Sequence, residues 1–69
     1  MKWIDVNTRV PDNGKCVFLK VHVTSVLNIV DREDILSAEY IDGKWCVDGR
    51  VLPENDYPIF NAPVAWAEN

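Results

Sequence analysis

The fold of this chain is decided by the stretch Ile35-Leu36-Ser37-Ala38-Glu39-Tyr40-Ile41-Asp42-Gly43-Lys44-Trp45-Cys46-Val47-Asp48. Two runs with alternating side chains flank Asp42-Gly43. Such a pair between alternating runs is typical of a two-residue β-hairpin with a type I′ turn, in which both central residues have positive φ. In this hairpin Tyr40 lies opposite Trp45, and a cross-strand aromatic pair of this kind contributes about 0.5–1 kcal/mol.

A further strand is predicted from Cys16 to Val23, before the hairpin. One side of it carries Val17, Leu19, Val21 and Val23, and the other carries Cys16, Phe18, Lys20 and His22. This alternation indicates a half-buried strand. The preceding Pro11-Asp12-Asn13-Gly14 predicts a chain reversal with Pro11 at the second turn position, because Pro presets φ there and Asn-Gly tolerates left-handed backbone.

The remaining segments have weaker patterns. Residues 25–34 predict either a short helical turn or a mobile loop, and the charged cluster at 31–34 predicts a solvated turn. Residues 50–61, with two prolines, predict an irregular connection, and residues 62–67 a short closing strand that carries Trp66. No segment repeats apolar residues at helical spacing over three turns, which argues against a helical bundle.

These features predict one small domain over residues 1–69. Its fold class is mainly β, with a small α+β fold as the alternative: a compact antiparallel sheet of three to five short strands, with the Asp-Gly hairpin and at most one short helix. A hydrophobic content of 48% excludes disordered and collagen-like chains. Trp3, Trp45 and Trp66 are predicted to form the centre of the core, because each buries about 150–250 Å². The alternative is an aromatic platform for a base or sugar ring.

Net charge and composition limit the classes of binding partner and the location expected for this chain. Seven basic against eleven acidic residues give a net charge of −4. This opposes attraction to nucleic-acid backbones and anionic lipid, so neither direct nucleic-acid binding nor membrane binding is expected. The chain has no apolar run near the about 20 residues of a membrane span, and its first residues do not resemble a secretory signal. A cytoplasmic location is the expectation.

Catalytic chemistry and metal binding are not expected. Cys16 and Cys46 lack the C-x-x-C spacing of zinc or redox sites and are predicted to be buried, reduced thiols, so no metal or cofactor is assigned. The single histidine, His22, falls within a strand and has no nucleophile suitably placed beside it. The sequence does not give the spatial separation of the acidic residues, so it identifies no acid–base pair among them. The sequence therefore predicts a protein that is not an enzyme.

Trp3-Ile4-Asp5-Val6, then Arg9-Val10-Pro11 and Gly14, followed by Ala38, Tyr40, Gly43 and Trp45, make up a recognisable order of motifs. The order resembles the phage- and prophage-associated family called the domain of unknown function five-five-one. That family opens W-I-x-V-x-x-R-L-P-x-x-G and continues with A-x-Y-x-x-G-x-W. Of its closing motif, T-H-W-M-P-L-P, this chain keeps only Trp66. The resemblance implies a small β fold and a phage or prophage context, and it implies no catalytic residue.

Two functions are predicted. The first is a non-enzymatic binding protein of phage or prophage type, which occupies a host protein or sequesters a small anionic ligand such as a nucleotide. The candidate ligand-binding residues are Arg9, Tyr40, Trp45 and Arg50. Arg9 either bonds loop carbonyls or an acidic side chain, or offers a fork to a phosphate or carboxylate. The alternative function is a structural or accessory module that stabilises a larger assembly through a sheet edge. A homo-oligomer fits both functions.

Overall fold

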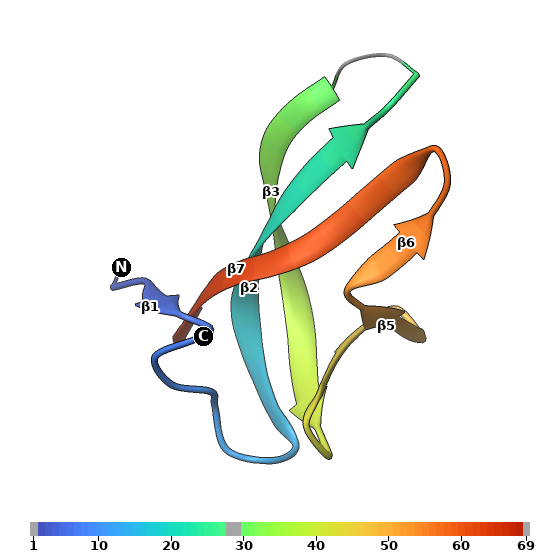
Figure 1. The fold of residues 1–69 in the computed structure, drawn as a ribbon. Helices are drawn as coiled ribbons and strands as arrows, with labels where there is room; N and C mark the ends of the chain where they lie inside the picture. Colours follow the sequence, from blue (N-terminus) through green and yellow to red (C-terminus); the bar gives the residue numbers. More distant parts are fainter. Residues whose placement is uncertain (1, 28–29, 69) are drawn as a thin grey trace.

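The computed structural model describes residues 2–27 and 30–68, and within them the chain forms seven strands and no helix (Figure 1). The mainly β fold class is thus confirmed, whereas the predicted three to five strands are too few. The strands are β1 (Ile4–Asp5), β2 (Lys15–Ser25), β3 (Val30–Ile41), β4 (Lys44–Val47), β5 (Arg50–Leu52), β6 (Glu54–Asp56) and β7 (Ile59–Glu68).

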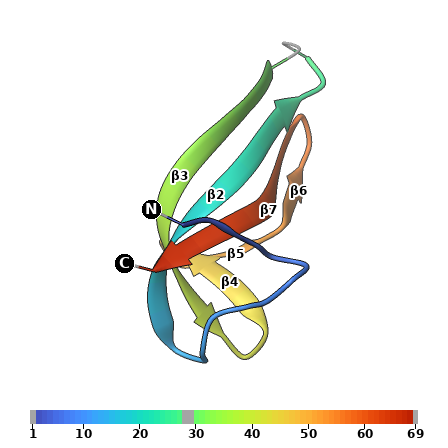
Figure 2. The same ribbon diagram turned by 90° about the vertical axis from the view of Figure 1, so that its left-hand side faces the viewer.

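All strand pairs are antiparallel, in the order β1-β7-β2-β3-β4-β5, and β6 pairs with β7. Only Pro53 separates β5 from β6. Because β5 pairs with β4 and β6 with β7, this short segment links the two ends of the sheet. The sheet therefore curls around its own inner face into a partly closed barrel (Figure 2).

The Asp-Gly hairpin is confirmed. Asp42 and Gly43 have φ angles of 50° and 79°, which are the positive values that the type I′ turn requires. Tyr40 pairs with Trp45 in the register of β3 and β4. The two ring centroids lie 4.7 Å apart with an interplanar angle of 61°, an edge-to-face contact.

The inner face of the sheet forms the core. The predicted alternation of β2 is confirmed, since its four apolar residues from Val17 to Val23 are buried and the side chains between them are partly exposed. The core cluster consists of Val17, Leu19, Val21, Val23, Ala38, Trp45, Val47, Leu52 and Trp66.

Trp3 does not belong to this core, in contrast to the prediction of a centre made of three indoles. Trp45 and Trp66 are 7% and 2% exposed, but Trp3 is half-buried. In β1, Ile4 pairs with Trp66 and packs against the core. Successive side chains of an extended chain point to opposite faces, so Trp3 lies on the outer face. There its ring centroid lies 4.5 Å from Nζ of Lys20.

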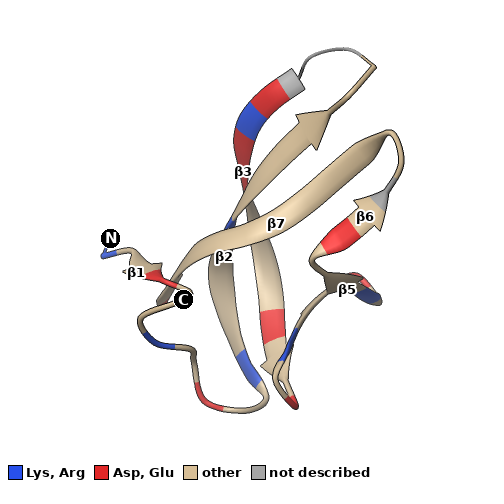
Figure 3. Ribbon diagram, in the orientation of Figure 1, with Lys and Arg blue, Asp and Glu red and all other residues tan. Residues whose placement is uncertain are grey.

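The predicted helical turn or loop at residues 25–34 is wrong for most of its length. β2 continues to Ser25 and β3 begins at Val30, with Thr24 paired to Asp31 and His22 to Glu33. The charged cluster at 31–34 is thus part of a strand and not a turn (Figure 3). The long edge of β2 supplies backbone hydrogen-bond partners to this segment, and this pairing stabilises a strand despite the low β-propensity of its polar residues. Of the predicted segment, residues 28 and 29 lie outside the described residues.

The irregular connection predicted for residues 50–61 is also wrong. It contains β5, β6 and the start of β7, and both of its X-Pro peptide bonds are cis. Pro53 lies between two strands and Pro58 in the turn before β7, so neither proline interrupts a strand. The closing strand predicted at 62–67 is confirmed and is longer than expected.

The chain reversal before β2 is confirmed with a shifted position. The N–H of Lys15 donates to the carbonyl oxygen of Asp12 at 3.1 Å, and Gly14 has a φ of 81°. Asn13 therefore occupies the second turn position and the buried Pro11 precedes the turn. The side-chain Oδ1 of Asn13 accepts a hydrogen bond from the N–H of Asp42 at 2.7 Å, which joins this turn to the hairpin turn.

Candidate functional site

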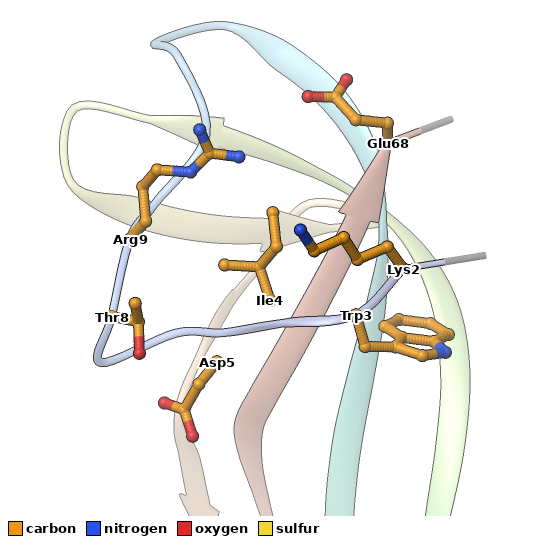
Figure 4. A pocket seen from close by; sticks show the side chains of 7 residues that line it. All are labelled: Lys2, Trp3, Ile4, Asp5, Thr8, Arg9 and Glu68. Carbon is orange, nitrogen blue, oxygen red and sulfur yellow. The ribbon is translucent and has the colours of Figure 1, made fainter.

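A cleft of about 770 Å³ opens between β1, the turn after it and the end of β7 (Figure 4). We call it the N-terminal cleft. It is lined by Lys2, Trp3, Ile4, Asp5, Thr8, Arg9 and Glu68. Lys2 and Arg9 extend on either side of Ile4, whereas Trp3 and Asp5 point away from Ile4 (Figure 4). The cleft thus presents two cationic groups beside an apolar side chain.

Trp66 holds Arg9 in place. The indole Nε1 donates a hydrogen bond to the backbone carbonyl oxygen of Arg9 at 2.7 Å, and the Arg9 guanidinium lies 5.3 Å from the centroid of the same ring. The N–H of Arg9 also donates to the carbonyl oxygen of Asp5 at 3.3 Å. The sequence left two roles open for the Arg9 side chain: bonding within the loop, or binding a phosphate or carboxylate. The hydrogen bonds to the loop are made by the backbone of Arg9, so its guanidinium remains available to the cleft.

The carboxylates of the N-terminal cleft are engaged elsewhere. Asp5 Oδ1 accepts a hydrogen bond from the N–H of Asn7 at 2.7 Å, and Glu68 Oε2 lies 2.6 Å from Nζ of Lys15. Within residues 2–27 and 30–68, neither Lys2 nor Arg9 forms an ion pair with a carboxylate. Unpaired guanidinium and ammonium groups at an apolar surface are suited to a phosphate or carboxylate.

A second cleft, of about 440 Å³, lies on the inner face of the barrel, and we call it the barrel cleft. It is lined by Val21, Val23, Ser25, Arg32, Asp34, Leu36, Arg50, Leu52, Ile59 and Asn61. Its charged groups are paired. Arg50 Nη1 lies 3.3 Å from Glu54 Oε1, which also accepts from Asn61 Nδ2 at 3.1 Å, and Arg32 Nε lies 3.2 Å from Asp34 Oδ1.

The four candidate residues occupy three different places. Arg9 lines the N-terminal cleft and Arg50 the barrel cleft. Trp45 is a core residue, and Tyr40 packs against the core beside it. The structure therefore does not gather the four into one site.

Lys2 was missed by the sequence analysis. Its position two residues before Ile4 places both on one side of an extended segment, and this alternation was the available signal. Its proximity to Arg9 depends on the turn after β1, and no sequence pattern predicts this turn.

The thiols and the histidine lie apart from the N-terminal cleft. Cys16 is exposed and Cys46 half-buried, both as free thiols, so the prediction of buried cysteines is wrong for Cys16. Each pairs in register with Glu39, which separates them. His22 Nε2 contacts Asp31 Oδ1. Among the residues of known placement, no three His, Cys, Asp or Glu side chains are grouped to hold a metal ion.

Within the described residues, no helix has the length and apolar character that crossing a membrane requires. Comparison of the chain with protein-family models, with curated proteins and with solved structures finds no match. The resemblance to the family five-five-one therefore stays a prediction from the motifs.

Proposed function

We propose that this chain is a non-enzymatic binding protein that sequesters a small anionic ligand, such as a nucleotide, in the N-terminal cleft. One observation carries the proposal: the guanidinium of Arg9, held over the ring of Trp66, shares the cleft with Lys2 and pairs with no described carboxylate. The resemblance to a phage- and prophage-associated family favours a phage or prophage context for such a protein.

The chemistry of the cleft supports binding over turnover. Arg9 offers a planar fork that matches two oxygens of a phosphate, and Lys2 offers a second charge to the same group or to its neighbour. Ile4 supplies apolar surface for the uncharged part of the ligand. The lining residues include neither His nor Cys, so neither an imidazole base nor a thiol nucleophile is among them.

The test measures the unfolding temperature of the protein with AMP, ADP or inorganic pyrophosphate. At ten times its Kd, a ligand stabilises the folded state by about 1.4 kcal/mol, which raises Tm by roughly 5 °C or more in a domain of this size. Arg9→Gln should remove most of this shift. Lys44→Gln is the matched control, because it removes the same charge from an exposed residue outside both clefts.

Stabilisation by none of these anions would contradict the proposal. So would an equal loss of binding in the two variants, since the effect would then come from net charge alone.

The second candidate function is the structural or accessory module that stabilises a larger assembly through a sheet edge. The specific observation is the length of β3. β2 pairs with it from Val30 to Tyr40, but β4 pairs only with Glu39, Tyr40 and Ile41. Light scattering after size-exclusion chromatography tests self-assembly, which would appear as a mass above 7.9 kDa that depends on concentration.

A further inference from the structure

We infer that the free edge of β3, residues 31–38, binds an extended basic peptide segment of a partner protein, whose alternate side chains enter the barrel cleft. This inference deepens the second candidate function, binding through a sheet edge, and does not depend on the anion site in the N-terminal cleft. It rests on three features of β3: its unpaired edge, the cleft beneath it and its charge.

The edge is long and open. The described strands that pair with β3 are β2 and β4, and β4 pairs with β3 only from Glu39 to Ile41. Residues 31–38 thus span about 27 Å and pair with no described strand on the side away from β2. Every second residue of an antiparallel strand directs its N–H and C=O away from its partner. An added strand would pair with these groups, as in domains that recognise peptides by strand addition.

The barrel cleft lies directly beside this edge. Arg32, Asp34 and Leu36 belong to the open stretch of β3 and also line the cleft. The apolar part of the lining continues across the sheet to Val21 and Leu52. A strand added to β3 would have alternate side chains on this same face, because the pleat alternates in register with that of its neighbour. An apolar side chain beside Leu36 would then enter the cleft.

The charge of the edge favours a basic partner. Residues 31–34 contain three carboxylates and one arginine (Figure 3). The arginine pairs with Asp34, and Asp31 Oδ1 contacts His22 Nε2. Asp31 and Glu33 are exposed on the outer face of the strand, followed by Ile35, which is 59% exposed. The complementary strand carries Lys or Arg beside the two carboxylates and an apolar residue beside Ile35.

A second copy of this chain fits the edge less well. Two β3 edges brought together would place six carboxylates and two arginines along one seam, and like charges directly opposite one another are destabilising. Charged residues on an edge strand also protect it from pairing with its own kind. The charge pattern therefore selects a partner of opposite sign.

The test uses the complete chain and a fluorescein-labelled peptide of eight residues, in which Lys alternates with Val and Leu. We expect saturable binding, followed by fluorescence anisotropy. In hydrogen exchange, the peptide should slow exchange of backbone amides at 31–38. The same peptide with an N-methyl group on every second residue cannot complete the backbone pairing, and its binding should be weaker by about tenfold or more.

Two double variants test the charge argument. Asp31→Asn with Glu33→Gln should weaken binding about fivefold. Asp12→Asn with Asp48→Asn removes the same total charge from two exposed turn residues, and this control should bind the peptide almost as the parent chain does. Circular dichroism verifies that both variants are folded.

Three results would overturn the inference: equal binding of the N-methylated peptide, exchange protection outside β3, or an equal effect of the two double variants. If the peptide fails to bind but the chain self-associates and the Asp31/Glu33 variant alters its mass, the sheet-edge module stands and the peptide proposal is wrong. If neither peptide binding nor assembly occurs, both are wrong.

Discussion

The ring of Trp66 contacts Arg9 in two ways, since its Nε1 donates to the Arg9 carbonyl oxygen at 2.7 Å and its face lies 5.3 Å from the guanidinium. The two residues are 57 positions apart in the chain. One core side chain therefore both anchors the N-terminal segment and orients the cation of the N-terminal cleft. Stability and anion binding are linked through this residue.

The first prediction concerns this link. Trp66→Phe removes the N–H donor and leaves the Arg9 carbonyl oxygen without its partner, which should lower the free energy of unfolding by about 1–3 kcal/mol. It should also weaken nucleotide binding, because the Arg9 backbone is no longer held. Urea denaturation and calorimetric titration measure the two effects. Trp3→Phe is the control: this half-buried ring lies outside the core, and its loss should cost less than about 1 kcal/mol.

The second prediction concerns the carboxylate at the rim of the N-terminal cleft. Glu68→Gln removes the carboxylate and frees Lys15, its partner at 2.6 Å. Lys15→Met instead leaves Glu68 unneutralised. Affinity for pyrophosphate should rise about threefold in the first variant and fall by a similar factor in the second, since exposed pairs contribute modestly. Both effects should shrink in 1 M NaCl, where the Debye length is about 3 Å. Changes in the same direction would show that the anion binds elsewhere.

The third prediction concerns Gly43. A Cβ here would meet no atom within 4 Å, yet the φ of 79° is one that L side chains rarely adopt. Gly43→Ala should therefore lower the free energy of unfolding by about 1–2 kcal/mol through the backbone alone. A synthetic chain with D-alanine at position 43 should be at least as stable as the parent, because D residues favour this φ. Equal losses for the two alanines would indicate a steric cause instead.

The fourth prediction concerns the contact between Tyr40 and Trp45. A double-mutant cycle with Tyr40→Leu and Trp45→Leu should give a coupling energy of about 0.5–1.5 kcal/mol, as for other edge-to-face ring pairs. Thermal and urea unfolding of the four chains provide the measurement. Tyr40→Leu combined with Ile35→Ala is the reference cycle, and it should be additive within about 0.5 kcal/mol because Ile35 lies five residues away on the opposite face.

The fifth prediction compares the two faces of the sheet. Leu19 is completely buried and Ile35 is 59% exposed. Leu19→Ala should lower the free energy of unfolding by about 2–5 kcal/mol, a large share of the roughly 3–10 kcal/mol expected for a chain of this length. Ile35→Ala should change it by less than about 1 kcal/mol. A cost for Ile35→Ala close to that for Leu19→Ala would show that the outer face is covered, for example by a second copy.

Local patterns were sufficient for the elements whose hydrogen bonds and side-chain faces are set by residues close in sequence. Alternation identified the buried side of β2, and the positive φ angles of Asp42 and Gly43 followed from the Asp-Gly pair between two alternating runs. The pairing of Tyr40 with Trp45 followed from the same turn, because a two-residue loop fixes the register on both sides of it.

Only the tertiary structure decided which polar segments became strands and which cations share a cleft. Residues 31–34 pair with β2, and residues 54–56 pair with β7. The long edges of β2 and β7 make this pairing possible, and the composition of the two segments does not predict it. Lys2 and Arg9 line one cleft because β1 adds to β7 and Trp66 holds the turn after it. The sequence by itself determined the hairpin, the buried face of β2 and the charge, since these depend on neighbours along the chain. The closure of the barrel and the two clefts depend on contacts between residues far apart in the sequence. Such contacts form only in the folded chain, so local sequence patterns do not predict them.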